Sequence, residues 1–260
     1  MTKLPERIAT GVYQVGLRGV NAFLIDLDDD GGAGTAVAGG PAATPAGEAD
    51  FSSGLVLIDA GIDKRARLIG EAIHAVGRTP ADLRAVVITH LHGDHVGGLA
   101  KVRAHSDAEV WMHPADAAQV REGVWMRPLD PGPGRVRSVI AKTAGRRPIP
   151  RRDSIAVEHE VNDGETLPFA GLEVVFTPGH TAGHVALLLP RDGGVLFVGD
   201  SATDYAGRLG YGPIYEDVAA GEASLHRLAS LQFEVAAFSH GRPIRAHASE
   251  RFRKRWPAEG

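Results

Sequence analysis

Histidine and aspartate are concentrated in one short stretch of this sequence, where His90, His92, Asp94 and His95 lie within six residues. The apolar run Ala85–Thr89 before them is typical of a buried strand. Alternate residues of an extended chain point to the same side, so His90 and His92 can bind one ion. Asp94 and His95 follow where the chain turns into a helix, which we expect to start near Val96. We therefore expect Asp94 and His95 to face a second position, next to the ion bound by His90 and His92.

Three further segments each place one polar residue just after a short apolar run: His180 after Phe176-Thr-Pro-Gly, Asp200 after Val195-Leu-Phe-Val-Gly and His240 after Val235-Ala-Ala-Phe-Ser. Together the seven side chains suffice for two ions if one carboxylate is shared, and each ion then keeps an open position, as catalytic metal sites do. Imidazole and carboxylate ligands favour two Zn²⁺, with iron or manganese as alternatives. Grouped without a metal, these side chains would repel one another or need many hydrogen-bond partners.

Short apolar runs and helical patterns alternate along the chain. The predicted strands are Val12–Val15, Ala22–Leu27, Leu55–Ile58, Ala85–Thr89, Val110–Met112, Ile155–His159, Leu172–Phe176, Val185–Leu189, Val195–Val198 and Val235–Phe238. The predicted helices are Lys64–Val76, Val96–Ala104, Ala115–Glu122 and Val218–Leu231. The order of strands followed by strand–helix alternation occurs twice, which predicts two similar halves in one α/β domain over residues 1–260, with the sheets inside.

Two segments interrupt this pattern. Residues 28–53 are rich in Gly, Ala, Pro and Thr and predict a mobile loop between two hairpin strands. Residues 121–152 carry eight Arg and one Lys against two acidic residues. We interpret this segment as a solvated connection, or as a lid that attracts an anionic substrate, with Arg127 holding a carboxylate. The basic tail at residues 251–256 is interpreted as a surface helix end.

Composition narrows the classes of function. The net charge of −4 gives no basic field for nucleic acid or an anionic membrane. Cysteine is absent, so neither a disulfide nor a thiolate nucleophile is available. The first residues lack the apolar stretch of a signal peptide, and no apolar run is long enough to span a bilayer. These features predict a cytoplasmic protein that acts on a small molecule, and they leave its oligomeric state open.

The motifs together resemble the metallo-β-lactamase superfamily, in its glyoxalase II-like and lactonase-like hydrolase branch. The resemblance runs from about residue 10 to about residue 245. It rests on Thr-His90-Leu-His92-Gly-Asp94-His95, then Thr-Pro-Gly-His180, Gly-Asp200, Ser-His240-Gly and, more weakly, Asn21-Ala-Phe-Leu-Ile and Leu-Ile-Asp59-Ala-Gly.

The resemblance implies a four-layer αβ/βα sandwich with the metals at one sheet edge. By position it implies a first metal on His90, His92 and His180 and a second on Asp94, His95 and His240. Asp200 would bridge the two, and Asp59 would orient a histidine ligand from behind.

Departures from particular branches are informative. Position 92 is histidine, where the flavodiiron branch usually has glutamate. Asp200 is present, where true β-lactamases generally lack a bridging aspartate. No long C-terminal helical region is predicted of the kind expected for glutathione-thioester binding in full-length glyoxalase II. These differences weaken each named activity and exclude none.

A dinuclear-metal hydrolase is the function we expect. Two adjacent dications lower the pKa of a shared water, and the bridging hydroxide attacks an ester, thioester or lactone. Asp94 is the expected catalytic residue, because it can orient the hydroxide and accept its proton. Tyr205 could donate to an oxyanion or be an ordinary packed or surface residue. His184 could face the substrate or could equally be a hydrogen-bonded structural histidine.

Three other functions stay open. The main alternative is an oxidoreductase, a persulfide dioxygenase of the same fold with one iron on His90, His180 and Asp200. A metal count distinguishes it from the hydrolase. A non-catalytic metal-binding protein is disfavoured by the complete ligand set. A nuclease is disfavoured by the acidic net charge and would show steep salt dependence.

Overall fold

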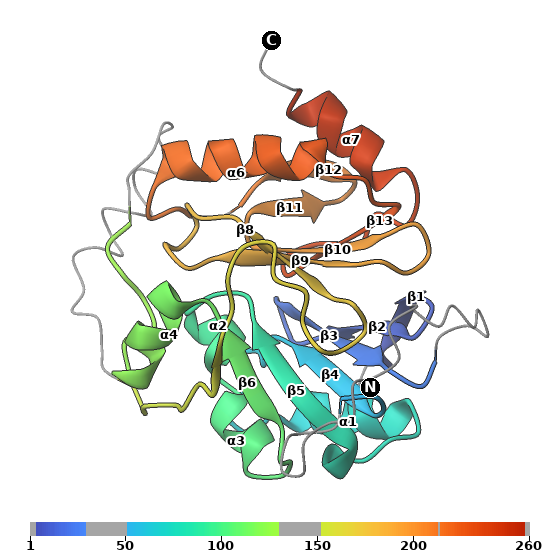
Figure 1. The fold of residues 1–260 in the computed structure, drawn as a ribbon, viewed down its shortest axis with the longest axis vertical. Helices are drawn as coiled ribbons and strands as arrows, with labels where there is room; N and C mark the ends of the chain where they lie inside the picture. Colours follow the sequence, from blue (N-terminus) through green and yellow to red (C-terminus); the bar gives the residue numbers. More distant parts are fainter. Residues whose placement is uncertain (1–3, 30–50, 130–151, 213, 258–260) are drawn as a thin grey trace.

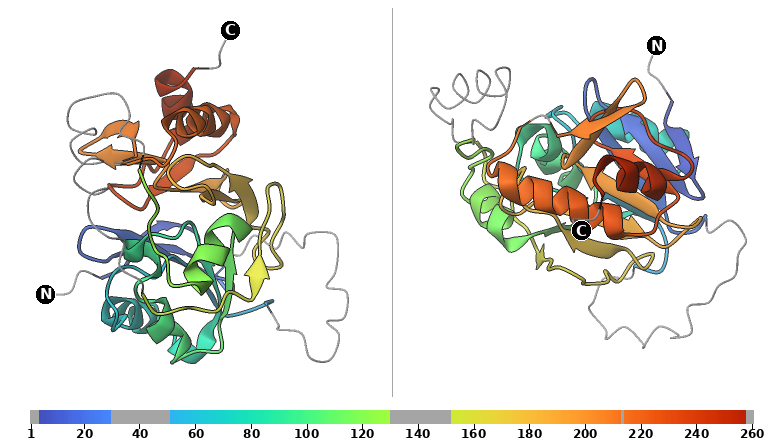
Figure 2. Two further views of the ribbon diagram at one scale, coloured as in Figure 1. Left: turned by 90° about the vertical axis from the view of Figure 1, so that its left-hand side faces the viewer. Right: turned by 90° about the horizontal axis from the view of Figure 1, so that it is seen from above.

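Two β-sheets lie face to face between two layers of helices in the computed structural model (Figure 1). It describes residues 4–29, 51–129, 152–212 and 214–257. Helices α1 and α3 cover the outer face of one sheet, and α6 and α7 cover the outer face of the other (Figures 1 and 2). This helix–sheet–sheet–helix sandwich confirms the predicted fold class. Most of segments 28–53 and 121–152 lies outside the described residues, so the loop and lid predictions stay predictions.

The first sheet is built from seven strands in sequence order: β1 (Glu6–Ala9), β2 (Val12–Gly16), β3 (Asn21–Asp26), β4 (Leu55–Ile58), β5 (Leu83–Ile88), β6 (Glu109–Met112) and β7 (His159–Glu160). Neighbours are antiparallel from β1 to β4 and parallel from β4 to β7. The second sheet has the order β13-β10-β9-β8, with β8 (Glu173–Phe176), β9 (Val185–Leu189), β10 (Val195–Gly199) and β13 (Val235–Phe238). A separate hairpin pairs β11 (Ala202–Tyr205) with β12 (Arg208–Tyr211).

The helices fill the connections between the strands. They are α1 (Arg67–Ala75), the 3₁₀ turn η1 (Pro80–Asp82), α2 (Gly93–Val96), α3 (Leu99–Arg103), α4 (Pro114–Arg121), α6 (Val218–Ser230) and α7 (Ala248–Arg255). None of the helices within the described residues is long and apolar enough to cross a membrane.

Alternating side chains explain why the central strands are continuous apolar runs. In β4, Leu55 and Leu57 pack under the helices of the first half, whereas Val56 and Ile58 pack between the two sheets. The strand β10 divides its side chains in the same way between the sheet interface and the layer under α6 and α7. Strands buried on both faces lose the polar alternation of surface strands. Side chains of both sheets therefore form one apolar cluster between them.

Local structure differs from the sequence prediction in several places. The helix expected from Val96 begins at Gly93 and is divided at Gly97 and Gly98. There the amide of Gly98 donates to the carbonyl of Gly61 (3.0 Å), and the backbone of the β4–α1 connection leaves no room for a Cβ atom at either glycine. The strand expected at Ile155–His159 is reduced to His159–Glu160. The hairpin β11–β12 was not predicted, because its strands are short and partly polar.

Candidate metal centre

Turns at the ends of four strands carry the predicted ligands. The strand β5 leads into His90 and His92, β8 into His180, β10 into Asp200 and β13 into His240. The register places β8, β10 and β13 in the same direction, so their carboxyl ends meet at one edge of the second sheet. The amide of Val185 donates to the carbonyl of Thr89 (3.0 Å), which joins this edge to the end of β5 in the first sheet.

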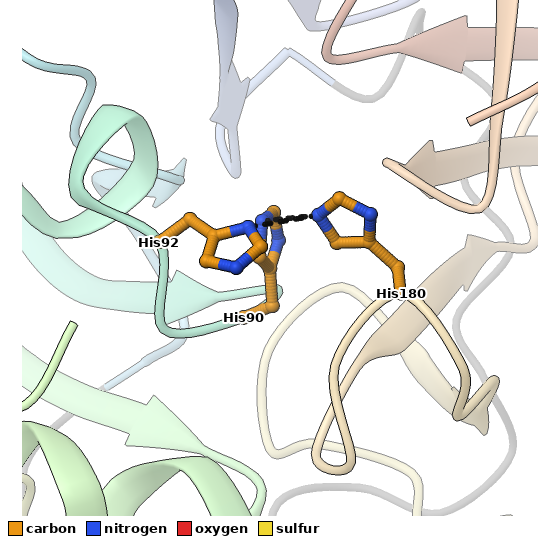
Figure 3. A group of neighbouring side chains, drawn as sticks. All are labelled: His90, His92 and His180. Carbon is orange, nitrogen blue, oxygen red and sulfur yellow. Dashed lines mark hydrogen bonds between the residues drawn. The ribbon is translucent and has the colours of Figure 1, made fainter. Parts of the chain in front are cut away.

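His90, His92 and His180 form a first trio of buried imidazoles. The Nε2 atom of His180 lies 3.1 Å from Nε2 of His90 and 2.9 Å from Nδ1 of His92. Figure 3 shows the two rings from the β5 turn facing His180 from the opposite sheet. Nitrogen ligands about 2.0–2.1 Å from a tetrahedral zinc ion are roughly 3.3 Å apart, which is close to this spacing. The trio can therefore hold one ion after a small expansion.

Asp94, His95 and His240 form a second trio, whose ligand atoms all lie within 4.8 Å of one another. The Oδ2 atom of Asp94 is 3.3 Å from Nε2 of His240 and 3.8 Å from Nε2 of His95. Asp94 and His95 reach this position because both lie in α2.

Asp200 lies between the two trios. Its Oδ2 atom is 3.4 Å from Nε2 of His180 and 3.3 Å from Nε2 of His240. Its Oδ1 atom is 3.6 Å from Nε2 of His95. The carboxylate is thus within reach of a ligand from each trio, which is the position that a shared ligand requires.

Backbone and carboxylate acceptors orient three of the rings. The Nδ1 atoms of His180 and His240 lie 2.7 Å from the carbonyl of Ile214 and 2.8 Å from that of Gly19. A carbonyl only accepts, so both Nδ1 atoms carry the proton. Nδ1 of His95 lies 2.7 Å from Oδ2 of Asp59. Each ring therefore presents Nε2 to the centre, as histidine ligands with an outer hydrogen-bond acceptor do.

Unpaired buried atoms test whether the residues fit metal ions. Three atoms of the centre, Nε2 of His92, Nε2 of His95 and Oδ1 of Asp200, are among the buried polar atoms of the described residues that have no hydrogen-bond partner. Buried polar atoms without partners are uncommon because they are costly. A cation bound by Oδ1 of Asp200 and by Nε2 of His95, after that nitrogen has lost its proton, would remove that cost. The donor set therefore fits divalent ions.

The histidines of the centre fall into two groups, one with a lowered and one with a raised side-chain pKa. Burial, with repulsion from His95 and the other rings, lowers the pKa of His90 well below its ordinary value. Burial also opposes the charge of His95 and His240, but neighbouring carboxylates outweigh it. Asp59 and Asp200 raise the pKa of His95 to about 9, and hydrogen bonds to Asp200 and Asp94 raise that of His240 to about 11.

Asp94 is the most exposed of the ligands, with 35% of its side chain accessible. Burial raises its pKa, but the hydrogen bond to His240 and the charge of His95 outweigh burial and hold the pKa at about 2. Asp94 is therefore an ionised acceptor that a molecule entering from solvent can reach.

His184 lies beside the centre but does not face it. Its ring is fully buried. The Nε2 atom accepts the amide hydrogen of Asp200 (3.0 Å), and Nδ1 lies 2.8 Å from Oγ1 of Thr177. Both nitrogens are occupied within the protein, so His184 has no atom for a substrate, which corrects the expectation from the sequence.

Tyr205 is 57% exposed at the end of β11. Its neighbour Asp204 forms a bridge to Gly241, the residue after His240. Tyr205 is thus the exposed end of a strand whose other residues are buried and which is attached to the His240 turn. Its predicted contact with a substrate stays a prediction.

Asn21 holds the His240 turn from the first sheet. Its Nδ2 donates to the carbonyl of Phe238 (2.9 Å) and lies 3.1 Å from that of Gly241. The backbone amide of Asn21 donates to Ser239. Sequence reasoning placed Asn21 in a family-like strand and gave it no role. A polar residue at the start of an otherwise apolar strand was the available signal.

Comparisons with known proteins agree with this geometry. The sequence profile of the metallo-beta-lactamase superfamily matches residues 50–240. The probable metallo-hydrolase YflN of Bacillus subtilis is 34% identical over 56% of this chain and 54% of its own length. A hydroxyacylglutathione hydrolase of Synechococcus is 34% identical over 52% of this chain and 40% of its own length. The chain thus matches about half the length of these relatives or less. A metallo-beta-lactamase structure from Cronobacter sakazakii covers 92% of this chain and 78% of its own, with 26% identity and a TM-score of 0.62.

Proposed function

Since this chain belongs to the metallo-beta-lactamase superfamily, we propose that it is a metal-dependent hydrolase that uses two divalent ions to cleave an ester, thioester or lactone of a small molecule. The observation that carries the proposal is the pair of ligand trios with Asp200 between them. A single-iron dioxygenase would use only His90, His180 and Asp200, and would leave the trio of Asp94, His95 and His240 without a function.

The ions would supply a Lewis acid for the carbonyl oxygen and would make a water molecule acidic enough to attack at neutral pH. Asp94 is the side chain that orients this water, because it is ionised and reaches solvent. The water oxygen forms a bond to the carbonyl carbon, the bond to the leaving oxygen or sulfur breaks, and the leaving group takes up a proton. Neither a serine nor a cysteine nucleophile is needed.

Names of the relatives support the choice of substrate class. A relative from Cupriavidus metallidurans, 34% identical over 60% of this chain, is named hydroxyacylglutathione hydrolase, and a fungal relative is named a thioesterase. We propose a thioester or a related carbonyl compound on this basis. Zinc is the ion we favour, because the ligands are imidazole and carboxylate.

Metal analysis of the purified protein, beside turnover of thioesters, lactones and phosphodiesters, tests the proposal. We expect two ions per chain and hydrolysis of a carbonyl substrate. His92→Ala and Asp94→Asn should lower kcat/KM by about 10²- to 10⁴-fold, whereas His74→Ala, which removes an exposed histidine of α1, should leave it unchanged. One iron per chain with oxygen uptake, or turnover that survives both site substitutions, would overturn the proposal.

A further inference from the structure

Asp116 is a buried carboxylate in the first turn of α4, outside both ligand trios. Its Oδ2 atom accepts hydrogen bonds from the amide of Leu91 (3.0 Å) and the hydroxyl of Thr181 (2.6 Å). Its Oδ1 atom accepts from the amide of Gly183 (2.9 Å) and from Nη2 of Arg127 (2.6 Å). Both oxygens are therefore fully engaged.

The donors to Asp116 belong to the two turns that carry the first trio. Leu91 lies between His90 and His92, and Thr181 directly follows His180. These turns come from different sheets, after β5 and after β8. The Asp116 carboxylate thus connects the turn that carries His90 and His92 with the turn that carries His180.

The Asp116 carboxylate is closely packed against the turn that carries His180. A Cβ atom at position 183 would lie 2.6 Å from Cγ of Asp116 and 2.7 Å from its backbone nitrogen. Only glycine lets the His180 turn approach Asp116 this closely. The contacts of the carboxylate therefore fix the distance between the turn after β5 and the turn after β8.

Arg127 balances the buried charge of Asp116. Its Nη2 atom also donates to the carbonyl of Ala115 (2.7 Å), and its Nη1 atom lies 2.9 Å from Oε2 of Glu216. Glu216 in turn accepts the amide hydrogen of Ala182 (2.8 Å), in the same turn as His180. Arg127 is thus engaged by internal carboxylates, which differs from the expectation that it holds a substrate.

We infer that Asp116 is a positioning residue that keeps His90, His92 and His180 at ligand spacing across the two halves of the protein. The inference rests on the proposed function, in which this trio holds an ion. Asp116 contacts none of the residues of the second trio in any hydrogen bond or ion pair between described residues. Its loss should therefore weaken one of the two ions selectively.

Asp116→Asn is the sharpest variant, because it keeps the shape of the side chain. An amide has one oxygen, so two of the four hydrogen bonds lose their acceptor whichever way it is turned. Thr181→Val removes one donor and leaves the carboxylate in place. Asp26→Asn is the matched control, since Asp26 is also buried and ion-paired, with Arg78, but lies in β3.

Zinc binding to each full-length protein, measured by competition with a chromogenic chelator, tests the inference. We expect Asp116→Asn to lower the affinity for one of two zinc ions by about 10- to 100-fold, as loss of an outer-shell partner does. Thr181→Val should produce a smaller decrease at the same ion, and Asp26→Asn none.

The outcomes separate this inference from the proposed function. Wild-type affinity for both ions in the Asp116→Asn and Thr181→Val proteins would overturn the inference, as would equal weakening of both ions. If Asp116→Asn does not fold, as judged by circular dichroism, Thr181→Val alone decides. A wild-type protein that binds no zinc would instead overturn the proposed function.

Discussion

The Oδ2 atom of Asp59 lies 2.7 Å from Nδ1 of His95, and both side chains are fully buried. Asp59 follows β4 with a φ of 61°, a conformation that aspartate adopts more readily than most residues. Its other oxygen accepts the amide hydrogen of Thr89 (2.9 Å), the residue before His90. Asp59 therefore connects the end of β4 with both the β5 turn and a ligand in α2.

Asp59→Asn should weaken the site without disrupting the fold, because an amide oxygen can still accept from His95 but carries no charge. The pKa of His95 in the metal-free protein, about 9 with Asp59 present, should fall. Affinity for one zinc ion should decrease by about 10- to 100-fold. Titration of the histidine resonances by NMR checks the first effect and chelator competition the second. A pKa that does not move would show that the other carboxylates, Asp200 and Asp94, set the charge of His95.

Metal binding should release protons and should strengthen as the pH rises from 7 to 9. The raised pKa values of His95, about 9, and His240, about 11, mean that both rings are cationic at neutral pH in the metal-free protein. A ligand nitrogen must be deprotonated, so an ion must displace these protons. Calorimetric titrations in two buffers of different ionisation enthalpy measure the number released. Binding enthalpies that do not depend on the buffer would contradict this prediction.

Stability of the metal-free protein should follow the opposite trend with pH. The folded-state pKa of His95 lies above the ordinary value of 6.5, so the folded protein holds this proton more tightly than the unfolded chain does. The resulting stabilisation is fully present below pH 6.5, where both states carry the proton. Between pH 6.5 and about 9 only the folded state carries it, and the stabilisation decreases with pH. This contribution should be lost as the pH rises through about 9. Urea unfolding at pH 6, 8 and 10 checks it, with His95→Gln as the control in which the loss should be smaller.

His184→Phe should destabilise the fold. A somewhat larger aromatic ring would fill the site, but the amide of Asp200 and the hydroxyl of Thr177 would lose their partner. Each buried polar group left unsatisfied costs about 1–3 kcal/mol. Denaturant unfolding should show a lower midpoint, and His184→Gln, which keeps an acceptor, should lose less. Equal midpoints for wild type and His184→Phe would mean that these hydrogen bonds add no stability.

Asn21→Leu should affect the second trio through the His240 turn. The substitution removes the donor to the carbonyls of Phe238 and Gly241 while keeping a side chain that branches at the same carbon. We expect lower affinity for the ion bound by Asp94, His95 and His240, and a lower kcat. The ion of the first trio should be retained, which a zinc titration resolves. Loss of both ions together would indicate a general loss of structure.

The family could be predicted from the sequence, and so could the candidate ligands that the structure brings together, because their signals are local. His90, His92, Asp94 and His95 are close along the chain, and each later ligand directly follows an apolar run. The same local patterns predicted β4, β9 and β10, whose side chains are buried on both faces. The strand β1 and the hairpin β11–β12 could not be predicted in this way, because partly polar strands are stabilised by their neighbours rather than by an apolar pattern.

Only the tertiary structure decided how these pieces meet. The tail at residues 251–256, interpreted from the sequence as a surface helix end, is part of α7. Its Phe252 and Trp256 are buried in the apolar layer between the second sheet and its helices. The local sequence does not reveal the role of Asp116. An aspartate in the first turn of a helix is common because its charge interacts favourably with the helix dipole. Three of the four donors to Asp116 lie 25, 65 and 67 residues away in sequence, and only Arg127 is nearer, 11 residues away. A local pattern reports which surfaces are apolar, whereas the contacts of one buried carboxylate depend on how two sheets pack together.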